Sequence, residues 1–206
     1  MPMELQHIKP QYMSEPEISG SDIYLQPRVV FEPGKKYMVC APSGHGKTSL
    51  LDFIYGSNRH FDGKMRYLDS APFDWRRDKL SYVFQDLRLF NELTAIENVR
   101  LKNNLTHYKS EQEMTSMLER LLPPEKKDQA VGTLSLGQRQ RVAVVRALCQ
   151  PFEFLLLDEP FSHIDHEQAL VVADLISEEV QRQGAGLIVT ALEPIDLFDF
   201  DITLNL

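Results

Sequence analysis

The chain has 206 residues, which is enough for one sizeable core but too short for a soluble domain fused to a membrane domain. Charged residues make up 25%, no run approaches the roughly 18 apolar residues that cross a bilayer, and residues 1–12 lack the apolar segment of a secretory signal. The net charge of −8 argues against a broad electrostatic hold on nucleic acid. We therefore expect one cytoplasmic domain over residues 1–206 that does not bind DNA or RNA.

The first third of the chain predicts a small β region followed by a strand, a tight loop and a helix. Residues 3–8 and 29–31 are typical of strands separated by turn-rich pieces, and they favour antiparallel pairing. Residues 36–40 predict a buried strand. Residues 48–55 have apolar side chains at helical spacing, and Gly56 follows them as a helix terminator. This order is the first half of a βαβ unit.

The middle of the chain predicts two helices. Residues 94–101 and 110–122 each begin with a Ser/Thr-x-x-Glu capping box, and Pro123 ends the second segment. The methionines of the second helix recur with leucines at helical spacing, so we interpret them as core residues rather than ligands. These residues are Met114, Met117, Leu118 and Leu121. We expect residues 86–131 to form an α-helical lobe inserted between two core segments, 1–85 and 132–206.

The last third alternates helices and strands. Helices are predicted over residues 137–148 and 167–183, and strands over residues 154–157 and 187–190. Such alternation favours an α/β fold with a mainly parallel sheet covered on both faces. Cys40 and Cys149 lie in apolar segments without metal-ligand spacing, so buried thiols are expected rather than a zinc site or a disulfide.

The segment APSGHGKT, residues 41–48, lies between a predicted strand and a predicted helix, which is the context of a phosphate-binding loop. Its glycines let backbone N–H groups surround phosphate oxygens at a helix start, whereas an ordinary glycine-rich turn is the alternative. Ala41 replaces the usual first glycine, so its backbone must suit a methyl group. Lys47 would contact the β- and γ-phosphates and Thr48 would bind Mg²⁺. The predicted nucleotide-binding residues are Ser43, Gly44, His45, Gly46, Lys47, Thr48 and Ser49.

Two further groups of polar residues follow predicted strands or begin a helix. Asp158 and Glu159 end the segment EFLLLDEP, where one carboxylate can hold Mg²⁺ and the next can face an attacking water, although two acids can also cap a turn. Gln85 lies in SYVFQD. Ser135 and Gln138 form a capping box in LSLGQRQR, and the backbone donors of such a helix start also suit an anion.

The motifs APSGHGKT, VFQD, LSLGQRQR, LLLDEP and FSHID stand in one order along nearly the whole chain. In this respect the sequence resembles the nucleotide-binding domain of ABC transporters. The resemblance implies a P-loop NTPase core that uses ATP and Mg²⁺. The run FQDLRLFNELTAIENVRL most resembles the small cassettes of lipoprotein release, macrolide export and cell-division permeases.

The resemblance also implies roles for individual residues. Glu159 would be the general base, assisted by Gln85 and Lys47, and Mg²⁺ would be held by Thr48, Gln85 and Asp158. ATP would lie between two copies of the chain in a homodimer, with the second copy contributing Ser135, Gly137 and Gln138, while Asp165 would contact the opposite subunit near its phosphate loop. The helical lobe would receive a coupling helix of an integral membrane permease, which places the protein on the inner face of the cell membrane.

Three positions depart from the family pattern. Ala191 stands where the family has a histidine that contacts the γ-phosphate, and either His163 or His166 would have to replace it. Leu136 replaces a signature glycine, and Tyr24 is the nearest candidate for the aromatic residue that stacks on adenine, unless it is a core tyrosine. We expect slow hydrolysis, and the alternative function is a slowly hydrolysing nucleotide-dependent clamp or regulator of a membrane complex. A soluble ABC protein acting on DNA or ribosomes would need a coiled coil, zinc cysteines, tandem cassettes or a basic face, and the sequence offers none of them.

Overall fold

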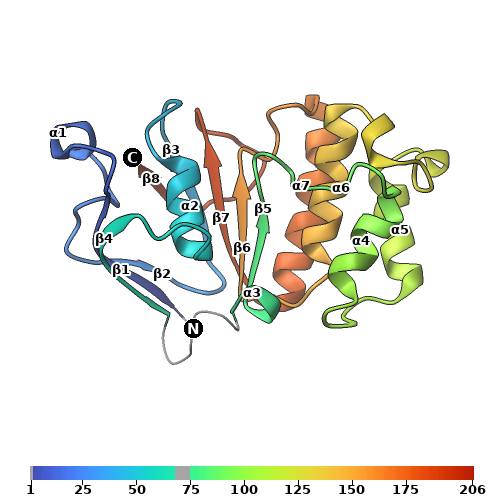
Figure 1. Ribbon diagram of the computed structural model, residues 1–206, viewed down its shortest axis with the longest axis horizontal. Helices are drawn as coiled ribbons and strands as arrows, with labels where there is room; N and C mark the ends of the chain where they lie inside the picture. The colour runs from blue at the N-terminus through green and yellow to red at the C-terminus, as the bar shows by residue number, and fades with distance from the viewer. Residues whose placement is uncertain (1, 68–74) are drawn as a thin grey trace.

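A five-stranded parallel sheet forms the centre of the molecule (Figure 1). The computed structural model describes residues 2–67 and 75–206. The strand order is β5-β6-β7-β3-β8, and all neighbouring pairs are parallel. The strands are β3 (Lys36–Cys40), β5 (Leu80–Val83), β6 (Phe154–Asp158), β7 (Gly186–Ala191) and β8 (Ile202–Asn205). The predicted mainly parallel α/β fold is confirmed, although neither β5 nor β8 was predicted.

A second, antiparallel sheet of three strands lies at the N-terminal end, on the left of Figure 1. Its order is β2-β1-β4, built from β1 (Met3–Pro10), β2 (Val29–Phe31) and β4 (Phe61–Tyr67). Met3 pairs with both Phe31 and Tyr67, so β1 is the central strand. This confirms the predicted antiparallel region. The short helices α1 (Glu15–Ile18) and α3 (Trp75–Asp78) complete this side.

The parallel sheet is covered on both faces, as predicted. Helix α2 (Lys47–Tyr55) and the antiparallel sheet cover one face, and α6 (Leu136–Leu148) and α7 (His166–Gln183) cover the other. The side chains of β6 alternate accordingly: Leu155 and Leu157 enter the cluster around α6 and α7, while Leu156 enters the cluster around α2. Helix α2 ends at Gly56, whose φ of 73° gives the left-handed conformation expected of a terminator.

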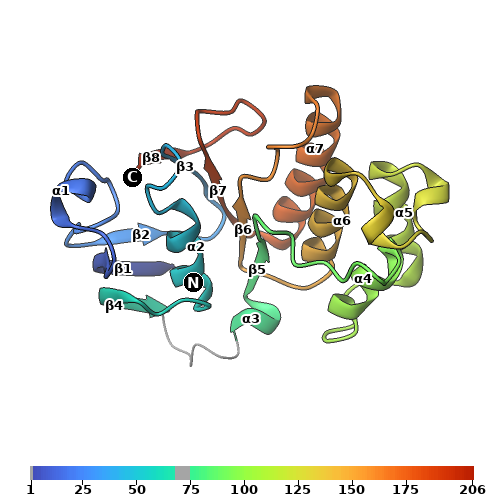
Figure 2. The same ribbon diagram turned by 45° about the horizontal axis from the view of Figure 1, so that its top comes forward.

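The helical lobe lies beyond α6 and α7, at the opposite end of the molecule from the antiparallel sheet (Figure 2). It contains α4 (Ala95–Asn103) and α5 (Glu111–Leu121), which begin at the predicted capping boxes of Thr94 and Ser110. The single turns η1 (Pro124–Lys126) and η2 (Val131–Thr133) lead back to α6. The four predicted core side chains of α5 are buried, so their interpretation is confirmed. The exact boundaries of the lobe, 86–131, stay a prediction.

Two further expectations concern the cysteines and the membrane. Cys40 and Cys149 are both buried and free, as predicted. Within residues 2–67 and 75–206, none of the helices combines the length and the apolar character that crossing a bilayer requires.

Candidate functional site

The phosphate-binding loop joins β3 to α2 with a tight backbone. Gly44 and Gly46 have φ values of 84° and 88°, a region that glycine adopts without steric cost. A side chain at Gly46 would also collide with Tyr24, because a Cβ there would lie 2.9 Å from the tyrosine hydroxyl oxygen. That hydroxyl donates a 2.7 Å hydrogen bond to the Gly46 carbonyl. Ala41 does not have a positive φ, so its methyl group is tolerated as expected.

Lys47 is a buried cation at the first position of α2. Its side chain is only 4% exposed, yet it carries a charge that must have partners in the interior. The ammonium group donates to the carbonyl oxygens of Ala41 and Pro42, at 2.6 and 3.0 Å, and forms a 3.3 Å ion pair with Glu159. Oxygen atoms therefore surround the ammonium group on several sides.

Strand β6 ends at Asp158, which lies at the base of the site. The side chain is buried, and its Oδ1 accepts a 2.7 Å hydrogen bond from the Thr190 hydroxyl. Its Oδ2 has no hydrogen-bond partner in the described part of the chain. Burial raises the pKa of Asp158, and the hydrogen bond from Thr190 opposes that rise.

The residues predicted to hold Mg²⁺ fit that ion. A buried carboxylate oxygen of Asp158 is unpaired, and the Thr48 hydroxyl donates to Gln85 Oε1 at 3.3 Å. Oxygen atoms of carboxylates, hydroxyls and amides are the ligands that Mg²⁺ takes in proteins. A cation there would also offset the unfavourable free energy of burying the charged Asp158 carboxylate.

Glu159 has a constrained backbone and a side chain that faces the loop. Its φ is 47°, unusual for a residue with a side chain, and its N–H donates to the backbone and side-chain oxygens of Thr190, each at 3.2 Å. The side chain lines a cavity of about 180 Å³ that brings the predicted catalytic residues together. This cavity is lined by Tyr12, Ser43, Gly44, Gly46, Lys47, Thr48, Ser49, Gln85 and Glu159.

The helix start at residues 135–138 forms as predicted but lies apart from this cavity. Ser135 caps α6, and the side chain of Gln138 accepts a hydrogen bond from the Ser135 backbone. None of Ser135, Gly137 and Gln138 is among the cavity-lining residues. Gly137 lies against the turn between β6 and α7, where a Cβ on Gly137 would lie 2.6 Å from the His163 carbonyl oxygen.

The histidines are not part of the cavity lining either. The His45 ring lies 3.1 Å from the Ser43 carbonyl, and His163 pairs with the Ser162 hydroxyl at 2.8 Å. Ala191 ends β7 and lines a neighbouring cavity beside Glu159. At the position where the resemblance leads us to expect a histidine, the chain therefore offers only a methyl group.

Two residues near the site were not predicted. Tyr12 is 58% exposed and lines the cavity, and its hydroxyl contacts that of Ser49. Tyr24 is completely buried below the loop and belongs to the core, so the alternative of a core tyrosine holds and not that of a ring stacked on adenine. Gln140 also acts here: its amide donates to the Glu159 carbonyl at 3.1 Å. The sequence offered one signal for Tyr12, namely an aromatic residue soon after the first strand. No local sequence pattern predicts the burial of Gln140.

Known proteins resemble this chain over most of its length. A family model described as ABC transporter matches residues 26–162. An uncharacterized ABC transporter ATP-binding protein of Mycobacterium tuberculosis is 32% identical over 77% of this chain and 51% of its own length, so the chain spans about half of that relative. A phosphonates import ATP-binding protein of Stutzerimonas stutzeri is 30% identical over 82% of this chain and 69% of the relative.

These relatives do not support the narrower resemblance to cassettes of lipoprotein release, macrolide export and cell-division permeases. The run on which that resemblance rested, residues 84–101, covers the loop after β5 and most of α4. In this chain it supplies the Thr94 cap and core residues of α4, which are structural roles and do not identify a subfamily.

A bacterial ABC transporter cassette solved as a dimer has the same fold. Its TM-score is 0.81 at 24% identity, over 98% of this chain and 94% of that one. The same cassette in a dimeric post-hydrolysis state, bound to ADP and Pi, has a TM-score of 0.75 at 25% identity, over 93% and 88% of the two chains. With the family model covering more than half of its residues, this chain belongs to the ABC transporter family of ATP-binding proteins.

Proposed function

We propose that the chain binds ATP with Mg²⁺ and hydrolyses it as the ATP-binding subunit of an ABC transporter. The observation that carries this proposal is the convergence of Lys47, Thr48, Gln85 and Glu159 on one cavity at the carboxyl ends of the parallel strands. A phosphate-binding loop alone would support only binding. The addition of a carboxylate beside it supports hydrolysis.

The site residues divide the work of phosphoryl transfer. Backbone N–H groups of the loop and the Lys47 ammonium would hold the phosphates, and phosphate oxygens would replace the carbonyls and the Glu159 carboxylate that Lys47 now contacts. Freed from Lys47, Glu159 would accept a proton from the attacking water. Gln85 would orient that water.

Two further groups complete the nucleotide site. Mg²⁺, held by Thr48, Gln85 and Asp158, would supply positive charge to the transferring phosphoryl group. The exposed ring of Tyr12 stands at the edge of the cavity and is our candidate for the aromatic platform under adenine. Its hydroxyl contact with Ser49 would hold the ring at the loop.

The site becomes complete in a homodimer. Ser135, Gly137 and Gln138 form a helix start that can bind an anion yet lies outside the cavity of its own chain, so they would contact the ATP of a second copy. Asp165, which caps α7 by accepting from Gln168 N–H at 3.0 Å, would contact the second copy near its loop. The dimer would attach to an integral membrane permease on the inner face of the membrane, and the permease would select the substrate.

Replacement of the family histidine by Ala191 lowers the expected rate without removing the general base. The test is steady-state ATP hydrolysis of Glu159→Gln, for which we expect a loss of at least about 100-fold while ATP binding persists. Glu167→Gln, an exposed change in the first turn of α7, is the matched control. Equal turnover in Glu159→Gln and wild type would refute the role of Glu159.

A further inference from the structure

A second cavity lies beside Glu159, next to the phosphate-binding cavity. It has a volume of about 400 Å³, and we call it the β7 cavity, because the end of β7 and the segment that follows form one of its walls. The turn after β6 forms the other wall. Glu159 lines both cavities, so a group that enters the β7 cavity would lie next to the proposed general base.

The charges around the β7 cavity favour a hydrogen-bond donor. Glu159 and Glu193 line it, and none of its described lining residues is a histidine, a lysine or an arginine. Lys47 pairs with Glu159 from the phosphate-binding cavity and would turn to the phosphates when ATP is bound. Ala191 adds only a methyl group. Carboxylates that have lost their cation attract a group with N–H donors or a positive charge.

His163 is close in sequence but does not enter the β7 cavity of its own chain. Ser162 lines that cavity, whereas His163 is exposed and is not among the lining residues. The Nδ1 atom of His163 lies 2.8 Å from the Ser162 hydroxyl oxygen, and its Nε2 atom has no hydrogen-bond partner among the described residues. One nitrogen of the imidazole is therefore held, and the other is available to a group outside its own chain.

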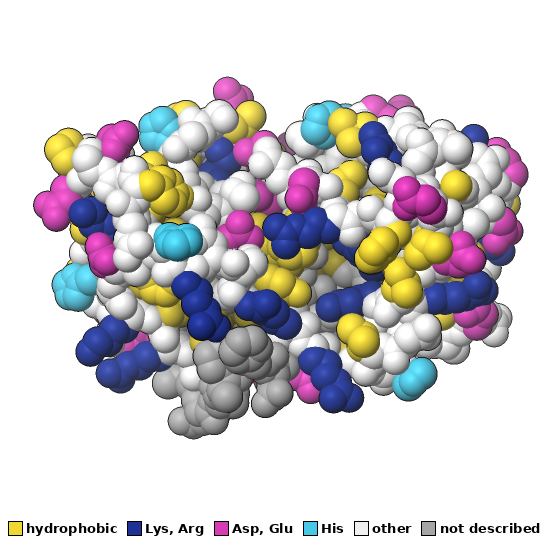
Figure 3. Space-filling view, in the orientation of Figure 1, with side chains coloured by type: hydrophobic (Ala, Val, Ile, Leu, Met, Phe, Trp, Pro, Cys, Tyr) yellow, Lys and Arg dark blue, Asp and Glu magenta, His cyan; other side chains and the backbone are white. Residues whose placement is uncertain are grey.

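The backbone of His163 lies against the helix start that the proposed dimer uses. A Cβ on Gly137 would lie 2.6 Å from the His163 carbonyl oxygen, so the close approach of the two segments requires glycine. Figure 1 shows the starts of α2, α6 and α7 along one edge of the molecule, at the carboxyl ends of the parallel strands. In the same view, Figure 3 shows histidine side chains at the surface along that edge. A contact of Gly137 with the ATP of a second copy would therefore bring His163 to the same nucleotide.

We infer that the imidazole of His163 from one copy enters the β7 cavity of the other copy and is a catalytic residue of the shared site. The ATP of one copy would lie against Lys47 and Glu159 of that copy, with Gly137 and His163 of the second copy on its other side. With a proton on Nε2, the ring would donate a hydrogen bond to a γ-phosphate oxygen as negative charge develops there. This inference rests on the proposed function and supplies the group that Ala191 lacks.

The first test is steady-state ATP hydrolysis by the purified full chain. His163→Ala should lower kcat at least about tenfold and leave KM for ATP within about threefold, because it removes a donor to the transition state. His163→Gln keeps an N–H donor and should retain more activity than His163→Ala. His166→Ala removes an exposed histidine from the first position of α7 and should hydrolyse ATP at the wild-type rate.

A second substitution in the β7 cavity makes this test specific. Ala191→His added to His163→Ala should restore most of the lost rate, because it returns an imidazole to the same cavity from β7. The two changes act on one interaction, so their effects should not be additive. Ala191→His should therefore increase the rate by a larger factor in His163→Ala than in the otherwise wild-type chain.

The second test asks whether His163 acts across the dimer. Copies with His163→Cys are mixed with copies with Leu192→Cys, a 52% exposed residue that lines the β7 cavity, and all copies carry Glu159→Gln to keep ATP bound. A short bifunctional thiol reagent should join the two copies when ATP and Mg²⁺ are present, since the natural cysteines are buried. Leu170→Cys, an exposed position on α7, takes the place of His163→Cys in the control and should give a much lower yield.

Three results would overturn the inference. They are equal rates for His163→Ala and either wild type or His166→Ala, no restoration by Ala191→His, and equal yields of joined copies for His163→Cys and Leu170→Cys. A wild-type chain that does not hydrolyse ATP would instead refute the proposed function.

Discussion

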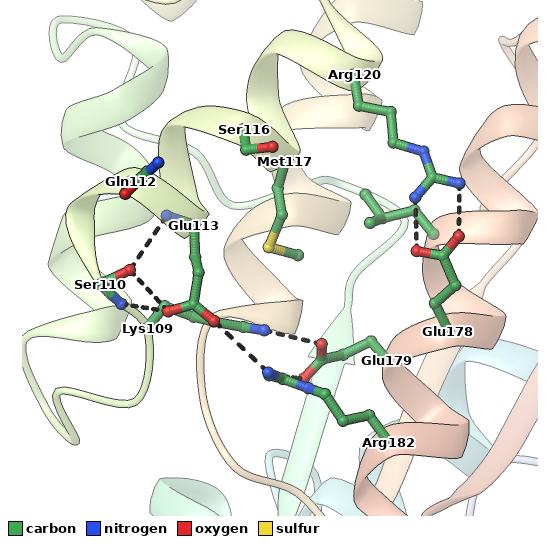
Figure 4. Close-up of a pocket in the computed structure, with 11 residues that line it drawn as sticks. Lys109, Ser110, Gln112, Glu113, Ser116, Met117, Arg120, Glu178, Glu179 and Arg182 are labelled. Carbon is green, nitrogen blue, oxygen red and sulfur yellow. Dashed lines mark hydrogen bonds and ion pairs between the residues drawn. The ribbon is translucent and has the colours of Figure 1, made fainter.

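Two lysines of this protein are equally buried but have different surroundings. The side chains of Lys47 and Lys109 are each 4% exposed. Lys47 is held by two backbone carbonyls and, at 3.3 Å, by Glu159. Lys109 donates to Glu179 at 2.8 Å, at the junction of the helical lobe with α7 (Figure 4).

The two lysines differ in the further contacts that their hydrogen-bond partners make. The second oxygen of Glu179 accepts from Tyr108, Arg182 and Gln183, at 3.0, 2.8 and 2.8 Å, so the ion pair belongs to a closed network. Both ion pairs line a cavity, but the cavity at Lys47 is formed by the glycines of the phosphate-binding loop, so the ligands of Lys47 can be exchanged for phosphate. A buried charge with a complete network indicates structure, and one with replaceable partners indicates a site.

The largest expected effect is on stability at the lobe junction. Lys109→Met leaves the Glu179 carboxylate buried beside one fewer cation and should lower the free energy of unfolding by about 3–5 kcal/mol. Urea denaturation would measure it. The double variant Lys109→Met, Glu179→Leu should recover much of that loss. If Lys109→Met unfolds at the wild-type urea concentration, the junction does not depend on this pair.

The same network sets a pH dependence. Burial raises the pKa of Glu179, but hydrogen bonds from Arg182 and Lys109 outweigh it and hold the pKa below its ordinary value. A carboxyl group whose pKa is lower in the folded than in the unfolded protein stabilises the folded state at pH values above its unfolded-state pKa. This stabilisation is lost as the pH falls through its folded-state pKa. The stability difference between wild type and Glu179→Gln should therefore shrink below about pH 4.

Lys47→Ala should affect activity rather than stability. We expect ATP turnover to fall at least about 100-fold, because a positive charge at the developing transition state is lost. The midpoint of urea unfolding should change far less than in Lys109→Met. A comparable loss of stability in both variants would erase the distinction between the two lysines.

Tyr12 should have a smaller effect, confined to nucleotide affinity. Loss of a stacked aromatic ring in Tyr12→Ala should weaken ATP binding by about tenfold. Tyr12→Phe keeps the ring and removes only the contact with Ser49, so it should bind within about threefold of wild type. Isothermal titration with ATP separates the two variants. Equal affinities of Tyr12→Ala and wild type would remove Tyr12 from the adenine site.

The smallest expected effect is an increase in the rate of ATP hydrolysis. Ala191→His would place an imidazole beside Glu159, where a cavity adjoins the site, and should raise the hydrolysis rate a few-fold. Single-turnover hydrolysis is the appropriate measurement. An unchanged or lower rate would show that this chain is adapted to work without a group at position 191.

The sequence predicted the parts of the fold that have strong local patterns. The three capping boxes at Thr94, Ser110 and Ser135 each start a helix, and β3 has the predicted limits. The phosphate-binding loop was predictable for the same reason, because its glycines and Lys47 act locally. The nucleotide-binding roles of Ser135, Gly137 and Gln138 stay a prediction, since they concern a second copy.

Features that depend on distant contacts were not predictable. Strand β4 pairs with β1 across more than fifty residues and shows no clear alternation of buried and exposed side chains. Tyr12 was missed because the segment between it and Gly34 has no fixed period from which to count. Lys109 lies in an ordinary polar sequence, and its burial depends on its ion pair with Glu179 of α7 and on hydrogen bonds with Asn103 of α4.

The helix that begins at Ser135 lies against the segment after β6 at two points. Gln140 donates a hydrogen bond to the carbonyl of Glu159, and at Gly137 the segment is so close that a Cβ would lie 2.6 Å from the His163 carbonyl oxygen. A displacement of Glu159 would therefore act on the start of α6 through the hydrogen bond of Gln140. In the proposed dimer that helix start would contact the ATP bound by the other subunit. A movement of Glu159 at one nucleotide site would therefore be transmitted to the second nucleotide site through the helix.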